Sequence, residues 1–595
     1  MKQYKIVTGI LAIILAWTFF LHNLPAATQD LPPTEDLSLG AGVFVFRSGS
    51  SKASQKRFVA RNVAKAKRTK TERVATTQKI RRQYATLAKV TTTRTRVKPV
   101  APEAVKTAQI TKKTPKEVSI ILTGAGQYAF NEKKYDEAID YYLEAIKNDP
   151  NNQDANNGIS DAYTAQGDEY MGRDEARNAR NFYEDAVSYN PKNSSAYIGL
   201  GEVFESLDDS DKAVANYEAA LKIDKELTEI FAPLGVLYFQ KGDFTKADDF
   251  LTRAYAIDNT DAATNYYVGV LRFRQKKYDE AQTALQQTIK ADANQATAHY
   301  YLGATYDALN QDAAAIVEYK EAIRLNPNYA EAHFGLGAIY YGQKNYDESL
   351  AAYQKVVKLQ NTNGEAHANL GDVYRELKKY GEAEGEYRLA TAFIKNDAEL
   401  YSKYGYVLGK QFKWNNAITE LNNAIALSSD ALDYTNLGWA YYNAARYDLK
   451  AKLDAVGIAK LQLAKTALQK SVSLNDAFAP AYLNLGLTLN DLKEYQEASV
   501  VLKRATELRK NWIFAINELG IAYRQLKDYN NAVQQFQKAV ELDDRFDVGY
   551  YNLGEAEFRR GNIKEAKKAQ EKLKPLNRNL ANTLEIMILG ATMKQ

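Results

Sequence analysis

Apolar residues recur at spacings of three and four along most of the chain, which is the pattern of amphipathic helices. Residues 296–329 contain two such series separated by a short polar turn. In the first series Leu302 and Tyr306 lie four apart, and the second series starts at Ala315. Pro327 ends the second series, because the residue before a proline is disfavoured in a helix. The stretch therefore predicts two antiparallel helices joined by a tight turn.

The same pair of series repeats about every 34 residues. Each repeat has a small residue in the middle of its first series, and six consecutive steps from Gly201 to Gly405 are equal in length. A second small residue follows in the second series, for example Ala315 after Gly303. Small residues at both positions predict that the two helices of a repeat cross closely.

This length and pattern resemble the tetratricopeptide repeat family. The resemblance implies an all-α fold: a right-handed α-solenoid of about thirteen helix-turn-helix repeats over residues 118–575, preceded by a disordered basic arm. Residues 576–595 predict a capping helix that covers the last apolar face. The repeats are expected near residues 119–152, 153–193, 194–227, 228–261, 262–295, 296–329, 330–363, 364–397, 398–430, 431–478, 479–512, 513–546 and 547–575.

Two repeats are longer than the others. The step from Ser160 to Gly201 has seven extra residues, and the step from Gly438 to Gly486 has fourteen. Seven residues make about two helical turns, so helices can lengthen by this amount without rotating their apolar faces. We expect both insertions to form helical hairpins that protrude and could supply contacts, with an irregular loop as the alternative.

Residues 1–27 predict a signal peptide or an amino-terminal membrane anchor. Residues 6–21 are apolar and uncharged, and lysines precede them. At about 1.5 Å per residue the run is slightly shorter than a membrane core. Both hypotheses place the repeats in the cell envelope. A retained anchor would hold them at the membrane, and cleavage near Ala27 would leave them periplasmic or secreted. The alternative is that this apolar run forms a buried helix of the first domain.

Residues 28–117 predict a basic, low-complexity and largely disordered linker, with a short strand as the one candidate element before residue 47. Residues 47–116 carry 21 Lys and Arg against Glu72 and Glu103, whereas residues 117–595 carry 55 Lys and Arg against 68 acids. The arm could be a solvated spacer, or bind anionic membrane surfaces or envelope polymers, or fold back on the acidic repeats. Scarce aromatic residues disfavour nucleic acid as its partner.

Catalytic and metal-binding patterns are missing from the sequence. There is no cysteine, no phosphate-binding glycine loop and no metalloprotease motif. His299, His333 and His367 lie one repeat length apart, one in each of three consecutive repeats, and are interpreted as a packing column. We therefore predict a non-enzymatic protein without cofactor or metal.

The expected concave surface supplies the candidate binding residues. In proteins that the chain resembles, first helices line this surface and hold an extended peptide, and an asparagine ladder grips its backbone. An asparagine amide donates and accepts at once, as a peptide group requires. The matching residues are Asn369, Asn436, Asn484 and Asn552. Aromatic residues expected on the same face are Phe239, Tyr266, Phe273, Tyr300, Phe334, Tyr341, Trp439 and Tyr442, with core packing as the alternative for some of them.

The sequence thus predicts a scaffold that binds a protein segment along the concave face, on the outer side of the cytoplasmic membrane. The alternative is an accessory module for handling or secreting polysaccharide or peptidoglycan, since aromatic side chains also stack on sugar rings. Both hypotheses use the same inner face and differ in the ligand.

Overall fold

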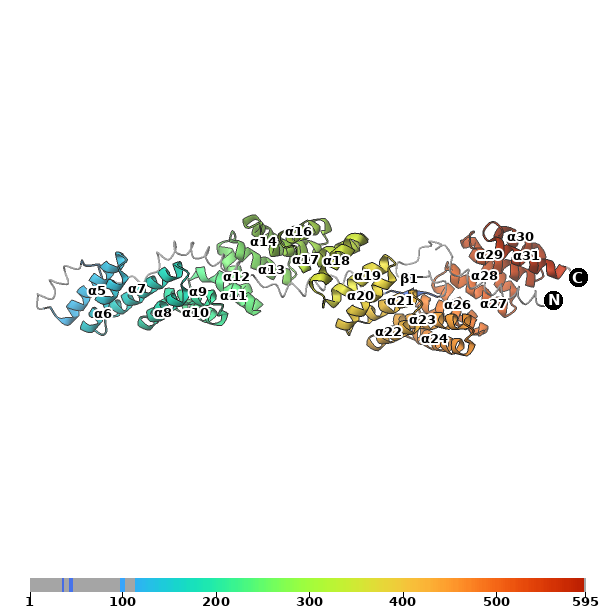
Figure 1. Cartoon of the computed structure of the whole chain (residues 1–595), viewed down its shortest axis with the longest axis horizontal. Coiled ribbons are helices and arrows are strands. Elements are labelled where there is room, and N and C mark those ends of the chain that lie inside the picture. Colours follow the sequence, from blue (N-terminus) through green and yellow to red (C-terminus); the bar gives the residue numbers. More distant parts are fainter. Residues whose placement is uncertain (1–34, 37–41, 47–96, 102–112, 593–595) are drawn as a thin grey trace. The chain divides into compact units, whose positions relative to one another are not determined.

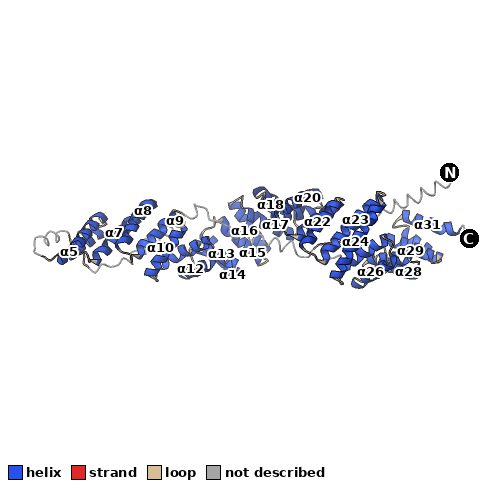
Figure 2. Ribbon diagram, turned by 90° about the horizontal axis from the view of Figure 1, so that it is seen from below, coloured by secondary structure: helices blue, strands red, loops and turns tan. Residues whose placement is uncertain are grey.

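The computed structural model describes residues 35–36, 42–46, 97–101 and 113–592. The predicted signal or anchor segment lies outside these residues. Within the described part no helix is both long and apolar enough to cross a membrane. The described chain is almost entirely helical (Figures 1 and 2), with a short two-stranded sheet of β1 (Glu35–Asp36) and β2 (Phe44–Val45).

Thirteen helical hairpins follow one another in the part of the chain that the structure describes, as the sequence predicts. Their first helices are α5 (Pro115–Asn131), α7 (Gln153–Gly172), α9 (Ser194–Ser206), α11 (Phe231–Lys241), α13 (Ala262–Arg274), α15 (Ala296–Ala308), α17 (Ala330–Gly342), α19 (Gly364–Glu376), α21 (Ala398–Lys410), α23 (Ala431–Lys450), α25 (Ala479–Asp491), α27 (Ile513–Gln525) and α29 (Asp547–Arg559). Their second helices are α6 (Tyr135–Asn148), α8 (Ala176–Tyr189), α10 (Ser210–Ile223), α12 (Phe244–Ile257), α14 (Tyr278–Ala291), α16 (Asp312–Leu325), α18 (Tyr346–Leu359), α20 (Tyr380–Phe393), α22 (Trp414–Leu427), α24 (Asp454–Leu474), α26 (Tyr495–Leu508), α28 (Tyr529–Leu542) and α30 (Ile563–Leu573).

The chain forms two compact bodies. The N-terminal body comprises Arg57–Gly335, and the C-terminal body comprises Leu336–Gln595 together with Met1–Lys56. The strands β1 and β2 therefore belong to the same body as the last repeats, although hundreds of residues separate them in sequence.

Small residues set how closely the helices of a repeat approach. A side chain at Gly486 would place its Cβ 2.3 Å from Cγ of Leu502, which is buried, and one at Gly303 would lie 2.9 Å from the Tyr319 ring. These distances are shorter than a van der Waals contact. The glycine thus makes room for the large side chain of the second helix, which confirms the predicted close crossing.

The two insertions differ in structure. The fourteen-residue insertion lengthens both helices of its repeat, so that α23 and α24 have 20 and 21 residues and form the predicted long hairpin. The side chains of Leu453, Val456 and Leu463 on this hairpin are about half exposed. The seven-residue insertion lengthens only α7, to 20 residues, while α8 keeps 14. The prediction of a paired hairpin is therefore wrong for this insertion.

The final helix α31 (Arg578–Thr592) covers the last repeat. Leu584 and Ile588 are buried against Leu573 of α30, and Leu584 fills the space beside Gly554. The end of the repeat array is thereby sealed from water on this side.

Part of the predicted disordered linker is ordered. In residues 97–101, the Val100 N–H donates to the Gly124 carbonyl at 2.9 Å, and the Val100 side chain lies where a Cβ on Gly124 would be. Residues 42–46 are also ordered and are buried apart from a half-buried Phe46. Strand β2 is the short strand that the sequence predicts before residue 47, and residues 97–101 are an ordered part of a linker that is predicted to be largely disordered.

Two of the histidines form charged packing contacts. In His367, Nδ1 lies 2.6 Å from the Glu386 carboxylate and Nε2 lies 3.0 Å from the Asn361 carbonyl oxygen. His299 is held in the same way, with Glu318 at 2.6 Å. Because a carboxylate and a carbonyl oxygen accept hydrogen bonds, the protonated ring, which donates from both nitrogens, satisfies both partners. The hydrogen bond to Glu386 raises the pKa of His367 accordingly.

We expect alanine at Gly486 to destabilise the protein by about 1–3 kcal/mol, because the added methyl overpacks the site beside Leu502. The matched control is Gly385→Ala in α20, where a Cβ would meet nothing within 4 Å. That change should stabilise by up to about 1 kcal/mol through helix propensity. Urea unfolding measures both, and equal stability of the two variants would contradict the crossing geometry.

We also expect His367 to stabilise its repeat in a pH-dependent way. Its folded pKa is raised, so the stabilisation is complete below its ordinary pKa and is lost as pH rises through the folded pKa. His367→Ala should cost about 1–3 kcal/mol at about pH 6 and less at about pH 8. Urea unfolding of both chains at both pH values tests this. A cost that is independent of pH would refute the imidazolium assignment.

Candidate functional site

Two asparagines of the predicted ladder hold the backbone of the chain's own strand β2. The Val43 N–H donates to Asn484 Oδ1 at 2.7 Å, and Asn484 Nδ2 donates to the Val43 carbonyl at 2.8 Å. Asn436 makes the same pair of bonds with Val45, at 2.9 and 2.8 Å. Each amide therefore satisfies both polar groups of one residue. We call this arrangement the strand site: residues 42–46 with Tyr406, Asn436, Trp439 and Asn484.

The spacing of the strand explains why alternate residues are held. Successive residues of a strand point their backbone groups to opposite edges, and residues two apart are about 6.6 Å from one another. Val43 and Val45 therefore face the first helices α25 and α23 in turn. The opposite edge of β2 pairs antiparallel with β1, with Asp36 opposite Phe44 and Glu35 opposite Val45. Strand β2 itself lies against α23.

The side chains of the strand divide between two walls. Val43 and Val45 join an apolar cluster with Tyr442, Leu485 and Trp512. All five of these residues are buried.

Phe44 and Phe46 point to an aromatic wall. The Phe44 ring centroid lies 4.9 Å from that of Tyr406 and 5.0 Å from that of Trp439, and Phe44 is fully buried. The Phe46 ring lies 4.8 Å from Tyr406, and the Arg375 guanidinium sits 4.7 Å from its centroid. Such edge-to-face and cation–π contacts favour aromatic residues at both positions.

Gly42 brings the chain into the strand site. Its φ of +86° lies in the region that side chains disfavour, and a Cβ there would be 2.8 Å from Asn484 Oδ1. A glycine is therefore required at this position by backbone conformation and by space.

The strand is held by a small net free energy. Burial of Val43, Phe44 and Val45 contributes about 2 kcal/mol each, and the four amide hydrogen bonds contribute about 1 kcal/mol each. Ordering five backbone residues opposes this by about 1.5 kcal/mol each. The difference is only a few kcal/mol, so the segment is bound in the folded protein and can also be released.

Charged residues occupy the ladder positions on either side of the two asparagines. Lys403 precedes Asn436 and donates to Asp372 at 2.8 Å; Asp372 also accepts from Tyr387. Burial favours a high pKa for Asp372, but Lys403 and Arg375 outweigh it and hold the pKa below its ordinary value. This cluster supports the wall beside Phe46.

On the other side, Glu518 follows Asn484. Burial raises the pKa of Glu518 to about 7, despite a hydrogen bond from Asn490 at 3.1 Å. The strand site thus lies between a buried cation and a carboxyl that is poorly solvated.

The other predicted ladder residues have different surroundings. Asn552 accepts from Arg524 at 3.0 Å and donates to Asn517 at 2.9 Å, so its amide is engaged within the repeats. Asn369 is buried, with 4% of its surface exposed. A partner-binding role for these two residues stays a prediction.

The predicted aromatic residues fall into two groups. Trp439 contacts the strand directly, and Tyr442 belongs to its apolar wall while its hydroxyl accepts from Arg446 at 3.0 Å. Tyr341 is half-buried and its hydroxyl lies 3.3 Å from Arg375.

The remaining aromatic residues lie in the N-terminal body. Phe239 is half-buried and packs edge-on against Tyr267, 5.1 Å away. Exposure is 6–7% for Tyr266 and Phe273, 1% for Tyr300 and 0% for Phe334. The nearly complete burial of Tyr300 and Phe334 leaves no surface for a partner to contact, which favours the packing alternative for them.

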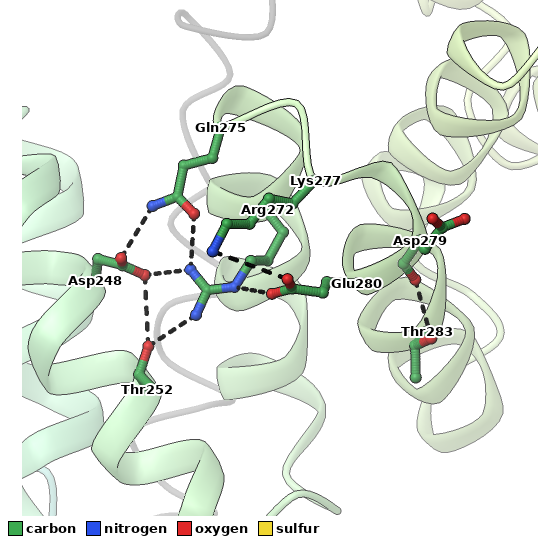
Figure 3. Close-up of polar contacts among 8 residues, drawn as sticks. All are labelled: Asp248, Thr252, Arg272, Gln275, Lys277, Asp279, Glu280 and Thr283. Carbon is green, nitrogen blue, oxygen red and sulfur yellow. Dashed lines mark hydrogen bonds and ion pairs between the residues drawn. The ribbon is translucent and has the colours of Figure 1, made fainter.

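A dense polar cluster in the N-terminal body links the helices of two repeats. Arg272 of α13 bonds Asp248 and Thr252 of α12 and also Glu280 of α14, as Figure 3 shows. Its neighbour Gln275 donates to Asp248 at 2.9 Å. Every guanidinium nitrogen of Arg272 has a partner here, so the cluster fixes the packing of two repeats. Among the described residues, no group of three potential ligands could hold a metal ion.

Sequence reasoning did not identify residues 42–46 as the occupant of the site, and it missed Tyr406. The run Val43–Phe46 is apolar at every position, which indicated a short strand but not where it binds. Tyr406 was identifiable only once the position of Phe44 was known.

Comparisons with known families place repeat models along the chain. Models described as tetratricopeptide repeat match residues 120–152, 364–397 and 479–511, and one described as TPR repeat matches residues 520–561. A model of the cilia and flagella-associated protein 70 C-terminal domain matches residues 151–369. No curated protein matches the chain.

Solved structures with similar folds cover different shares of the chain. A crystal structure of MamA is 28% identical with a TM-score of 0.25, covering 27% of this chain and 95% of its own. A tetratricopeptide repeat protein from Parabacteroides merdae is 16% identical with a TM-score of 0.30, covering 42% and 98%. The Cut9–Hcn1 complex of the APC/C is 15% identical with a TM-score of 0.34, covering 82% and 99%.

We expect the amides of Val43 and Val45 to exchange hydrogen slowly, on the order of 100-fold slower than an open segment. Replacing Asn436 and Asn484 together by alanine should remove most of this protection. The control is Asn422→Ala, an exposed asparagine of α22. Hydrogen exchange followed by mass spectrometry covers residues 42–46 in one peptide. Fast exchange in the unaltered chain, or no effect of the double substitution, would contradict the strand site.

Proposed function

Because the chain is a tetratricopeptide repeat protein, we propose that it is a non-enzymatic interaction scaffold that binds an extended protein segment on the first helices of its C-terminal body. Repeats of this family generally mediate contacts between proteins. The site for the segment is the strand site, where Asn436 and Asn484 present paired amides to a peptide backbone.

One observation supports this proposal above all: both asparagines contact backbone atoms of the strand. Each donates to a carbonyl and accepts from an N–H of the same residue. This pairing fits a peptide group and is independent of the side chain. Recognition of main-chain groups gives affinity, and the two side-chain walls give specificity.

The same geometry favours a peptide over a polysaccharide. A sugar ring offers hydroxyl groups and an apolar face, but no fixed alternation of one donor and one acceptor every two residues along a strand. The Tyr406 ring is tilted against Phe44 with an interplanar angle of 52°, and the Trp439 ring meets Phe44 edge-on at 77°. Phe44 thus covers the aromatic faces on which a sugar ring could stack.

We further propose that the scaffold acts on the outer side of the cytoplasmic membrane. This rests on the sequence alone, on the apolar run of residues 6–21. The mass of the mature amino terminus would distinguish a retained anchor from a chain cleaved near Ala27.

An array of peptides about nine residues long, paired with a panel of envelope oligosaccharides, tests the proposed ligand class. We expect the full chain to bind a subset of peptides, with binding weakened at least about tenfold by the double change Asn436→Ala and Asn484→Ala. Asn422→Ala should bind as the unaltered chain does. Binding to oligosaccharides alone, or peptide binding that ignores the two asparagines, would overturn the proposal.

A further inference from the structure

We propose that the strand site selects segments in which a glycine is followed by alternating aliphatic and aromatic residues, and that residues 42–46 are its resident, displaceable ligand. This inference rests on the proposed function and adds to it a partner class and a competitor. The partner is a protein segment of the pattern glycine–aliphatic–aromatic–aliphatic–aromatic, which this chain itself carries as Gly42 to Phe46.

The first three positions of the pattern follow from contacts at the Asn484 end. The backbone at Gly42 has φ +86° and a Cβ would meet Asn484 Oδ1 at 2.8 Å, so only glycine fits. Val43 is completely buried in an apolar cluster, which suits a branched aliphatic side chain and excludes a charge. Phe44 fills the space between Tyr406 and Trp439.

The last two positions follow from contacts at the Asn436 end. Val45 lies on the apolar wall with 6% of its surface exposed. Phe46 lies beneath the Arg375 guanidinium and beside Tyr406. A lysine or arginine in place of Phe46 would meet the positive charge of Arg375, so the cation selects an aromatic ring here. A segment in which valine and phenylalanine change places would put phenylalanines against the apolar wall. The closely packed cluster there has no room for them.

The resident strand is held against the helices by non-covalent contacts, so a competing segment can displace it. Residues 47–96 separate it from the next described segment, and its contacts with the repeats are hydrogen bonds and side-chain packing only. A ligand attached to its own receptor competes at a high effective concentration. A partner must therefore match the pattern well, or be present at a high local concentration, to replace residues 42–46.

A fluorescent peptide with the sequence of residues 40–48, GAGVFVFRS, probes this directly. It would be titrated by anisotropy into three full-length chains: unaltered, Phe44→Asp, and Phe44→Asp combined with Asn436→Ala and Asn484→Ala. The aspartate should expel the resident strand because a charge cannot be buried unpaired. Val43→Asp serves as a second release variant, and circular dichroism confirms that the helices remain.

We expect the Phe44→Asp chain to bind the peptide at least about tenfold more tightly than the unaltered chain. The two asparagine changes should then weaken binding at least about tenfold. A peptide in which the valines and phenylalanines change places, GAGFVFVRS, should not bind. Equal binding to the unaltered and Phe44→Asp chains would overturn the competitor role while leaving the proposed function intact. Equal binding of the exchanged peptide, or no binding to either release variant, would overturn the selected pattern. The proposed function fails separately, if the peptide array ignores Asn436 and Asn484.

Discussion

The close crossing of the two helices within each repeat is the constraint on which the structure depends. A single helical hairpin cannot bury its apolar face, so each repeat needs its neighbours. The glycine or alanine at the crossing lets a large buried side chain of the second helix fill the space, as Leu502 does beside Gly486. Because this contact recurs from repeat to repeat, first helices follow one another in register and carry their side chains in rows.

The strand site is a consequence of that register. Asn436 and Asn484 occupy the same position in consecutive repeats, and the longer repeat between them is accommodated by the hairpin of α23 and α24. Two rungs in register can hold residues two apart on an extended chain. The neighbouring rungs are Lys403 and Glu518, whose charges change what the row can bind. The asparagine pair is therefore a short site for a few residues of strand, with specificity supplied by the two walls.

The sequence was sufficient to predict the repeats, because the pattern of each one is complete within about 34 residues. The pair Asn436 and Asn484 was also predicted, through the resemblance and the chemistry of an amide. The occupant was not predicted, because the hydrogen bonds between β2 and the asparagines join residues 391 and 441 positions apart. An apolar run such as Val43 to Phe46 indicates burial but not the partner.

The aromatic residues show a second limit of sequence reasoning. On a helix, neighbouring positions differ by about 100°, so a residue assigned to the inner face can instead point into the crossing. Tyr300 is such a case: its ring packs against Tyr301 and Tyr329 and is almost fully buried. Trp439 is buried too, but the group that covers it includes Phe44. Sequence alone could not separate these cases, because both residues are large and aromatic and both are assigned to the inner face of a first helix.

The central claim, that residues 42–46 are bound to the asparagine pair, can be tested by thiol labelling because the chain has no cysteine. Val45→Cys introduces a single thiol at a position with 6% exposure. We expect this thiol to react with a soluble thiol reagent on the order of 100-fold more slowly than a cysteine at exposed Ser429, and quickly once Asn436 and Asn484 are both alanine. Reaction of Val45→Cys at the rate of the exposed control would contradict the account.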